Sequence, residues 1–314
     1  AKKPAIRLRY AYQAIRMAFY SGNNNMASDL FNSMITTRED NYLYYRSLSL
    51  KAGALYRAKK NNASAYLYSL VFDRCDELKK EAYTGFKWAV NGKISPLLAL
   101  CKNEHEKAVI YVMQGLYDYD GERSTMLSAM QNAYSLDPKV RGIDILMTRS
   151  INKAESTLLE GIATTKKGDK VLNDLNTFAK KAAADGKSGH KAYWLLSSAY
   201  IYTLSGDIAN TKKYLDLAAK EKMTANEQDV HYIITALYTV RKNGNITAKT
   251  EEELLPSLRE IEQRAAKEKR YSILFSNIML IMMKNVYVAQ GNMVKAVYCY
   301  SKTYPSNTEY NFND

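Results

Sequence analysis

Apolar residues recur at helical spacing along almost the whole chain, in segments of about 12–20 residues separated by short polar stretches. These stretches are rich in Gly, Asn and Asp, as at residues 22–25, 243–245 and 291–292. Gly or Asn is favoured just past the end of a helix, because both residues tolerate the left-handed conformation that closes it. No convincing run alternates between apolar and polar residues as a half-buried strand would. The pattern therefore predicts an all-α protein.

The breaks divide the predicted helices into pairs, each with a short turn between its two members. In three of these pairs a small or slim residue lies five positions after a turn glycine, and a bulky residue follows four positions later. These residues are Ala27 and Phe31, Thr211 and Leu215, and Ala296 and Tyr300. A small side chain lets two helices approach closely, and the bulky one fills the space beyond it. The expected pairs cover about residues 5–36, 40–75, 76–102, 104–136, 140–184, 188–220, 225–268 and 270–304.

This arrangement resembles the tetratricopeptide repeat (TPR), a helix–turn–helix unit of about 34 residues. The pairs that end at Pro305 and Pro138 match its pattern best, although Met126 takes the small position in the second of them. Ile110 and Leu280 stand where the repeat has a tryptophan in its first helix. The resemblance implies a right-handed α-solenoid of antiparallel helix pairs, a TPR-like superhelix, over most of the chain.

One segment interrupts the succession of pairs. Residues 161–169 hold two glycines, two threonines and two lysines, and they separate a long helix from the next one. Such a composition is typical of a loop. We therefore expect a single TPR-like α-solenoid over residues 1–314, with a seam near 161–169 that would divide it into sub-solenoids 1–160 and 170–314.

The composition is that of a folded chain without a metal or disulfide framework. Of 314 residues, 46% are hydrophobic and 25% are charged, which is typical of folded rather than disordered proteins. The 3 Cys and 3 His are widely spaced, so we expect no disulfide framework, no metal site and no cofactor. The best membrane candidate, residues 273–288, contains Lys284 and is shorter than the roughly 18–20 apolar residues of a membrane helix. No transmembrane segment is expected.

Three motifs invite a catalytic or ion-binding interpretation, and each lacks a necessary part. Residues 186–188 (Gly-Lys-Ser) resemble the end of a phosphate-binding loop, but Lys181 stands where that loop needs its first glycine. Cys101 and His105 are four residues apart, yet a helix boundary is expected between them. The carboxylates of residues 118–122 lack the further ligands of a calcium loop. We therefore expect that the protein is not an enzyme.

The charge is strongly positive, with 45 Lys and Arg against 32 Asp and Glu and a net charge of +13. Many lysines occur in scattered pairs near expected helix ends, where cations suit the helix dipole and solvated faces are common. A basic stripe on one face would instead indicate attraction to an anionic polymer. Tyrosine is abundant, with 26 residues, most of which we expect to pack between helices with the hydroxyl at water.

In a TPR-like array the first helix of each pair lines the concave surface, and its outer positions are the candidates for ligand contact. Projecting the better pairs onto that surface selects residues of types that are common where proteins bind peptides. The groove-facing candidates are Tyr12, Arg16, Tyr111, Tyr119, Trp194, Tyr202 and Asn285.

These observations favour a non-catalytic protein–protein interaction scaffold that binds a partner segment, a protein or peptide, in its concave groove. The alternative is binding of an anionic polymer, nucleic acid or acidic glycan, through a basic face. A third hypothesis is a helper segment of a larger chain that bears an enzyme. Degenerate repeats of this kind occur in uncharacterised bacterial envelope proteins. The resemblance therefore favours the bacterial periplasm or cell envelope, with the export signal removed, over the cytoplasm.

Overall fold

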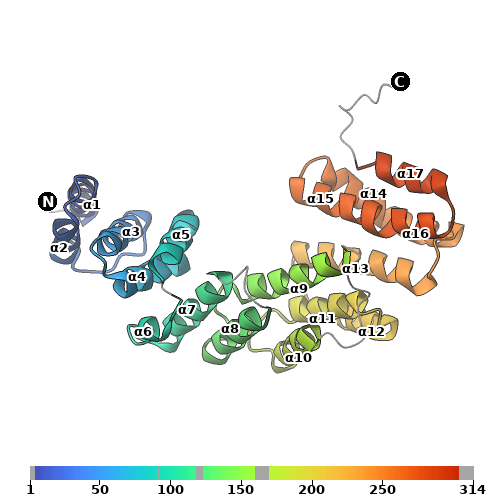
Figure 1. The fold of residues 1–314 in the computed structure, drawn as a ribbon, viewed down its shortest axis with the longest axis horizontal. Helices are drawn as coiled ribbons and strands as arrows, with labels where there is room; N and C mark the ends of the chain where they lie inside the picture. Colours follow the sequence, from blue (N-terminus) through green and yellow to red (C-terminus); the bar gives the residue numbers. More distant parts are fainter. Residues whose placement is uncertain (1–3, 91, 118–122, 160–169, 304–314) are drawn as a thin grey trace, which may run out of the picture. The chain divides into compact units, whose positions relative to one another are not determined.

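A computed structural model describes residues 4–90, 92–117, 123–159 and 170–303 and shows an all-helical chain without a strand in these ranges (Figure 1). The all-α prediction is thereby confirmed for the described residues. The chain divides into two compact units, Ala1–Ser150 and Ile151–Asp314, and the division falls inside helix α9 (Ile143–Leu159). The seam expected near 161–169 lies outside the described residues and stays a prediction.

The first unit consists of helices that pack on their neighbours in the chain. Contacts join α1 with α2, α3 with α4, α4 with α5, and α7 with α8, and α1 also packs on α3. Its helices before α9 are α1 (Pro4–Tyr20), α2 (Asn24–Met34), α3 (Tyr42–Arg57), α4 (Asn61–Arg74), a 3-10 turn (Asp76–Leu78), α5 (Lys79–Ala89), α6 (Ser95–Leu98), α7 (Glu104–Tyr117) and α8 (Arg123–Leu136).

The pair of α1 and α2 shows how local sequence builds this unit. The buried face of α1 repeats every three or four residues and consists of Leu8, Ala11, Ile15 and Ala18. Between the helices, Gly22 has a φ of 83°, a left-handed conformation that glycine adopts without steric cost. The Asn23 side chain then caps α2, because its oxygen accepts a hydrogen bond from the backbone NH of Met26 at 3.2 Å.

A close approach of α4 and α5 depends on the absence of a side chain. Tyr68 of α4 lies over Gly85 of α5, and a Cβ added at Gly85 would lie 2.3 Å from Tyr68 Cζ. The tyrosine ring therefore occupies the space that any other residue at position 85 would need. Burial raises the pKa of Tyr68 to about 12, as expected for a hydroxyl held between helices.

The second unit continues the same construction. Contacts join α10 with α11, α11 with α12, α13 with α14, and α14 with α15, and α17 packs on the π-helical stretch before it. Its helices after α9 are α10 (Lys170–Asp185), α11 (Lys191–Leu204), α12 (Ile208–Ala218), α13 (Ala225–Asn243), α14 (Ala248–Ala265), α15 (Lys269–Asn277), the π-helical stretch Ile278–Lys284, α16 (Asn285–Ala289) and α17 (Met293–Ser301).

Six of the eight expected pairs, all except the third and the fifth, consist of helices that contact each other in the described residues. The fifth corresponds to α9 and α10, and the residues between these two helices lie outside the described ranges. The third pair differs, because it contains the 3-10 turn, α5 and only the short α6. The small positions Ala27, Thr211 and Ala296 are buried, as predicted. The prediction that Tyr300 fills space between helices is wrong, since its side chain is 40% exposed on the last helix. The handedness and antiparallel arrangement of a solenoid stay predictions.

Candidate binding surfaces

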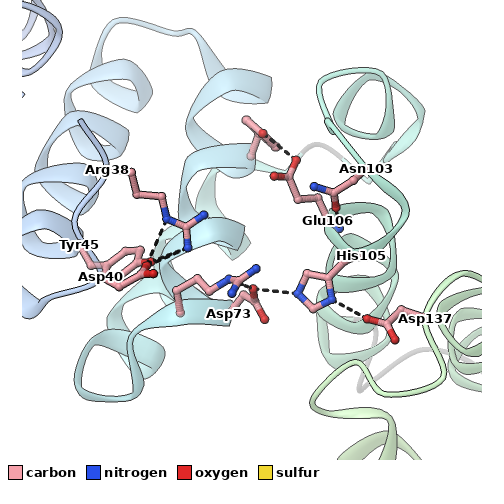
Figure 2. Close-up of polar contacts among 10 residues, drawn as sticks. Arg38, Asp40, Tyr45, Asp73, Asn103, His105, Glu106 and Asp137 are labelled. Carbon is pink, nitrogen blue, oxygen red and sulfur yellow. Dashed lines mark hydrogen bonds and ion pairs between the residues drawn. The ribbon is translucent and has the colours of Figure 1, made fainter. Parts of the chain in front are cut away.

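His105, at the start of α7, lies between two carboxylates (Figure 2). Its Nδ1 lies 2.6 Å from Asp137 Oδ2, and its Nε2 lies 3.0 Å from Asp73 Oδ2. Arg74 Nε lies 2.6 Å from the same oxygen of Asp73. Asp73 belongs to α4, and Asp137 follows the last residue of α8. The network therefore joins the ends of three helices.

This geometry leaves His105 with no free ring nitrogen to act as a general base. Acceptors at both nitrogens favour the imidazolium form, in which both nitrogens donate. Burial opposes that charge, but the hydrogen bonds to Asp137 and Asp73 outweigh it and raise the pKa of His105. Burial likewise opposes the charge of Asp137, and its contact with His105 nevertheless lowers the pKa of that carboxyl. Cys101, considered as a partner from the sequence, instead donates to the Leu97 carbonyl at 3.4 Å.

Three further polar contacts lie beside this network (Figure 2). Arg38 pairs with Asp40 at 2.9 Å, and the same carboxylate accepts a hydrogen bond from the Tyr45 hydroxyl. The Tyr66 hydroxyl donates to Glu106 at 2.9 Å, linking α4 to α7. These contacts hold helices and turns of the first unit together, and none of them presents an unpaired nucleophile beside His105.

The prediction that Trp194 faces a groove is wrong. Its side chain is 2% exposed, so it is not available to a partner. The indole Nε1 donates to Ser188 Oγ at 2.8 Å, and the ring lies edge-on to Phe178 with centroids 5.4 Å apart. A tryptophan on an apolar helix looks the same from sequence whether it faces the core or a ligand. Here the core between α10 and α11 holds it.

The other predicted groove residues are divided between the two units. Arg16 and Asn285 are exposed, whereas Tyr12, Tyr111 and Tyr202 are half-buried. Tyr12, Arg16 and Tyr111 belong to the first unit, and Tyr202 and Asn285 belong to the second. Tyr119 lies outside the described residues. Their role in a groove stays a prediction.

Helix α1 carries a second apolar stripe on the side opposite its buried face. Its members are Ile6, Tyr10, Met17 and Tyr20, which are 41%, 66%, 72% and 62% exposed. At about 100° per residue, this outer stripe lies half a turn from the buried one. Exposed Arg9 and Arg16 flank it. The spacing is present in the sequence, but two apolar stripes on one helix do not reveal which of them faces the core.

An open cleft of about 700 Å³ is lined by residues of α12, the turn after it and α13. Its lining, which we call the lysine cleft, includes four lysines and one carboxylate, namely Lys212, Lys213, Lys220, Lys242 and Asp216. Lys212 Nζ pairs with Asp216 Oδ2 at 2.7 Å. Lys242 Nζ lies 6.0 Å from the centroid of the Tyr238 ring, which also lines the cleft. Lys212 and Lys213 form one of the scattered lysine pairs that the sequence places on solvated helix faces.

Comparison with protein-family models, curated proteins and solved structures finds no match for this chain. Within the described ranges, no helix is long and apolar enough to cross a membrane. Among the same residues, no group of three or more His, Cys, Asp or Glu side chains is arranged to hold a metal ion.

Proposed function

We propose that the protein is a non-catalytic scaffold that binds another protein, and that the outer stripe of α1 is part of its interface. The stripe supports this proposal because large apolar side chains that gather on an exposed face mark interaction sites. The last helix adds a second apolar surface, with Val294 82% and Val297 66% exposed. The pairing of both nitrogens of His105 supports the non-catalytic part of the proposal. Binding in a concave groove remains what the TPR resemblance implies.

The shape of the outer stripe suits a helix of the partner. It runs from Ile6 to Tyr20, a length of about 21 Å at about 1.5 Å per residue. A narrow stripe of this spacing is typical of helix–helix packing, whereas a helix that lies in a membrane surface has a broader apolar face. Arg9 and Arg16 beside the stripe favour acidic residues on the partner helix.

The test is a pull-down from lysate of the source organism at low and high salt, with bound proteins identified by mass spectrometry. We expect the wild-type protein to retain a discrete partner at high salt, because apolar contacts survive the screening of charges. The double variant Tyr10→Ser and Met17→Ser should lose that partner. A matched control is Trp88→Ser and Ile145→Ser, since these side chains are also exposed, at 65% and 43%, and lie off α1.

Either of two outcomes would contradict the proposal. One is a wild-type protein that retains no discrete partner at high salt. The other is a partner that the stripe variant and the control variant retain equally well. Circular dichroism of both variants shows whether the fold is intact.

The second candidate function is binding of an anionic polymer, nucleic acid or acidic glycan. The lysine cleft is the observation that favours it, because four lysines and only one carboxylate line it. Retention of polyanions at low salt and their release at high salt, with no specific protein bound, would support this function over the first.

A further inference from the structure

The lysine cleft carries more positive charge than its own residues neutralise. Asp216 pairs with Lys212, which leaves the ammonium groups of Lys213, Lys220 and Lys242 without a carboxylate among the cleft residues. Lys213 and Lys242 lie over tyrosine rings, at 5.8 Å from Tyr214 and 6.0 Å from Tyr238. Like charges that gather on one concave surface raise the local concentration of anions and favour an anionic ligand.

The type of cation in the lining indicates which class of anionic ligand the cleft suits. The lining contains lysines and no arginine. A guanidinium forms a planar fork that matches a carboxylate in two hydrogen bonds, whereas an ammonium acts as a compact point charge. Several point charges without a fork recognise charge density along a chain rather than the geometry of one carboxylate. A chain of phosphate groups has that character.

The remaining lining is apolar and aromatic. Ile208 and Leu217 of α12 and Tyr238 of α13 contribute apolar surface beside the lysines. A polyphosphate chain has no group to place there. Nucleotide bases do, because single-stranded nucleic acids bind to grooves that combine cations for the backbone with aromatic rings for the bases.

We propose that the lysine cleft binds single-stranded nucleic acid, with Lys213, Lys220 and Lys242 at the phosphates and Tyr238 against a base. This inference rests on the second candidate function and narrows it to one polymer at one place. It is independent of the outer stripe of α1, which belongs to the other unit.

The first experiment measures binding of a fluorescent thymidine oligonucleotide of about 15 nucleotides by anisotropy at several salt concentrations. With about three phosphate contacts, the logarithm of the affinity should fall with a slope of about −2 against the logarithm of salt concentration. This slope corresponds to binding about 20-fold weaker at about 200 mM than at about 50 mM salt.

Charge-matched variants separate a site from the general attraction of a basic protein. Lys213→Glu with Lys220→Glu should weaken oligonucleotide binding by about tenfold or more and flatten the salt slope. Lys80→Glu with Lys93→Glu changes the net charge equally at exposed positions of the first unit and should shift affinity by about twofold or less. An equal loss of oligonucleotide affinity in the two double variants would contradict a specific binding site in the lysine cleft.

A second experiment asks which polymer the cleft prefers. Tyr238→Leu should weaken oligonucleotide binding and leave inorganic polyphosphate binding unchanged, because only the oligonucleotide has bases. Polyphosphate that binds as well as the oligonucleotide, with no effect of Tyr238→Leu, would overturn the assignment to nucleic acid.

A carboxylated glycan, polygalacturonate, completes the comparison. Binding of this glycan alone would overturn the nucleic-acid inference and leave the anionic-polymer function standing. Failure of all three polymers to bind would overturn both. Thermal unfolding of each variant establishes that a loss of binding is not a loss of fold.

Discussion

His105 shows how one charged residue can stabilise the packing of several helices in the first unit. Its raised pKa means that the imidazolium stabilises the folded state fully below the pKa of a free imidazole, about 6.5, and less as pH rises through the raised value. The lowered pKa of Asp137 means that its contribution is present above about 3.9 and disappears as pH falls through the lowered value. The network should therefore stabilise the fold most between about pH 4 and 6.5.

The variant His105→Gln tests this pH dependence. We expect it to lower the free energy of unfolding by about 1 kcal/mol at about pH 5.5, and by less at about pH 9, because deprotonation of wild-type His105 removes the positive charge between the two carboxylates. Urea unfolding at the two pH values measures the difference. His190→Gln is the control, because His190 is exposed, outside this network and in the other unit. An equal loss at both pH values would count against the charged form of His105.

Gly85 is a second residue whose effect on stability depends on one contacting residue, Tyr68, from a different helix. We expect Gly85→Ala to lower the free energy of unfolding by about 1–3 kcal/mol, because its Cβ would overlap the Tyr68 ring. Urea unfolding measures this cost. Tyr68→Leu removes the ring, so the double variant should lose less stability than the sum of the two single variants. Simple additivity would show that the ring is not the obstacle.

At the scale of one element, α1 is a helix with two apolar faces of different exposure. Ile15 is fully buried on the inner face, and Met17 is 72% exposed on the outer one. The two residues are close in sequence and similar in size, so they form a matched pair for testing which face holds the fold.

We expect Ile15→Ala to lower the free energy of unfolding by about 2–5 kcal/mol, because it leaves a cavity in the core. Met17→Ala should change it by about 0.5 kcal/mol or less, as is usual for exposed positions. Urea unfolding of both variants, repeated at several protein concentrations, measures the effects. A large, concentration-dependent cost of Met17→Ala would show that a second copy covers the outer stripe in solution.

The helix pairs themselves could be predicted from the sequence, and the reason lies within each element. Helical periodicity and the caps at both ends of a helix are local properties. The Asn23 side chain accepts a hydrogen bond from the backbone NH three residues later. Gly244, with a φ of 64°, forms the C-cap of α13. The starts of α7 and α12 follow from such signals, because Asn103 and Asp207 accept hydrogen bonds from the backbone NH groups of Glu106 and Asn210.

At the scale of the whole molecule, contacts gather within two compact units. We expect Ile15→Ala to accelerate hydrogen exchange in the helices around α1 and to leave α11–α17 unchanged, because local openings follow cooperative units. Hydrogen exchange with mass spectrometry measures this. Leu196→Ala, in the core of α11, is the reciprocal control and should affect the second unit alone. A response of both units to either variant would contradict their independence.

The sequence by itself determined that the described chain is helical, where most helices begin and end, and which small residues lie between them. These properties depend on neighbours within about four positions, and such neighbours are visible in the order of residues. The sequence indicated a seam near 161–169, but the position of the division at Ser150 depends on which helices share contacts.

Only the tertiary structure decided which face of each helix is covered. It buried Trp194, left Tyr300 and the outer stripe of α1 exposed, and placed Lys242 beside the lysines of α12. It also brought His105 to Asp73 and Asp137, each 32 positions away. Such pairings arise when helices pack against one another. The order of apolar and polar residues in the sequence gives the spacing of residues on each helix, but it does not give the helix that each face will contact.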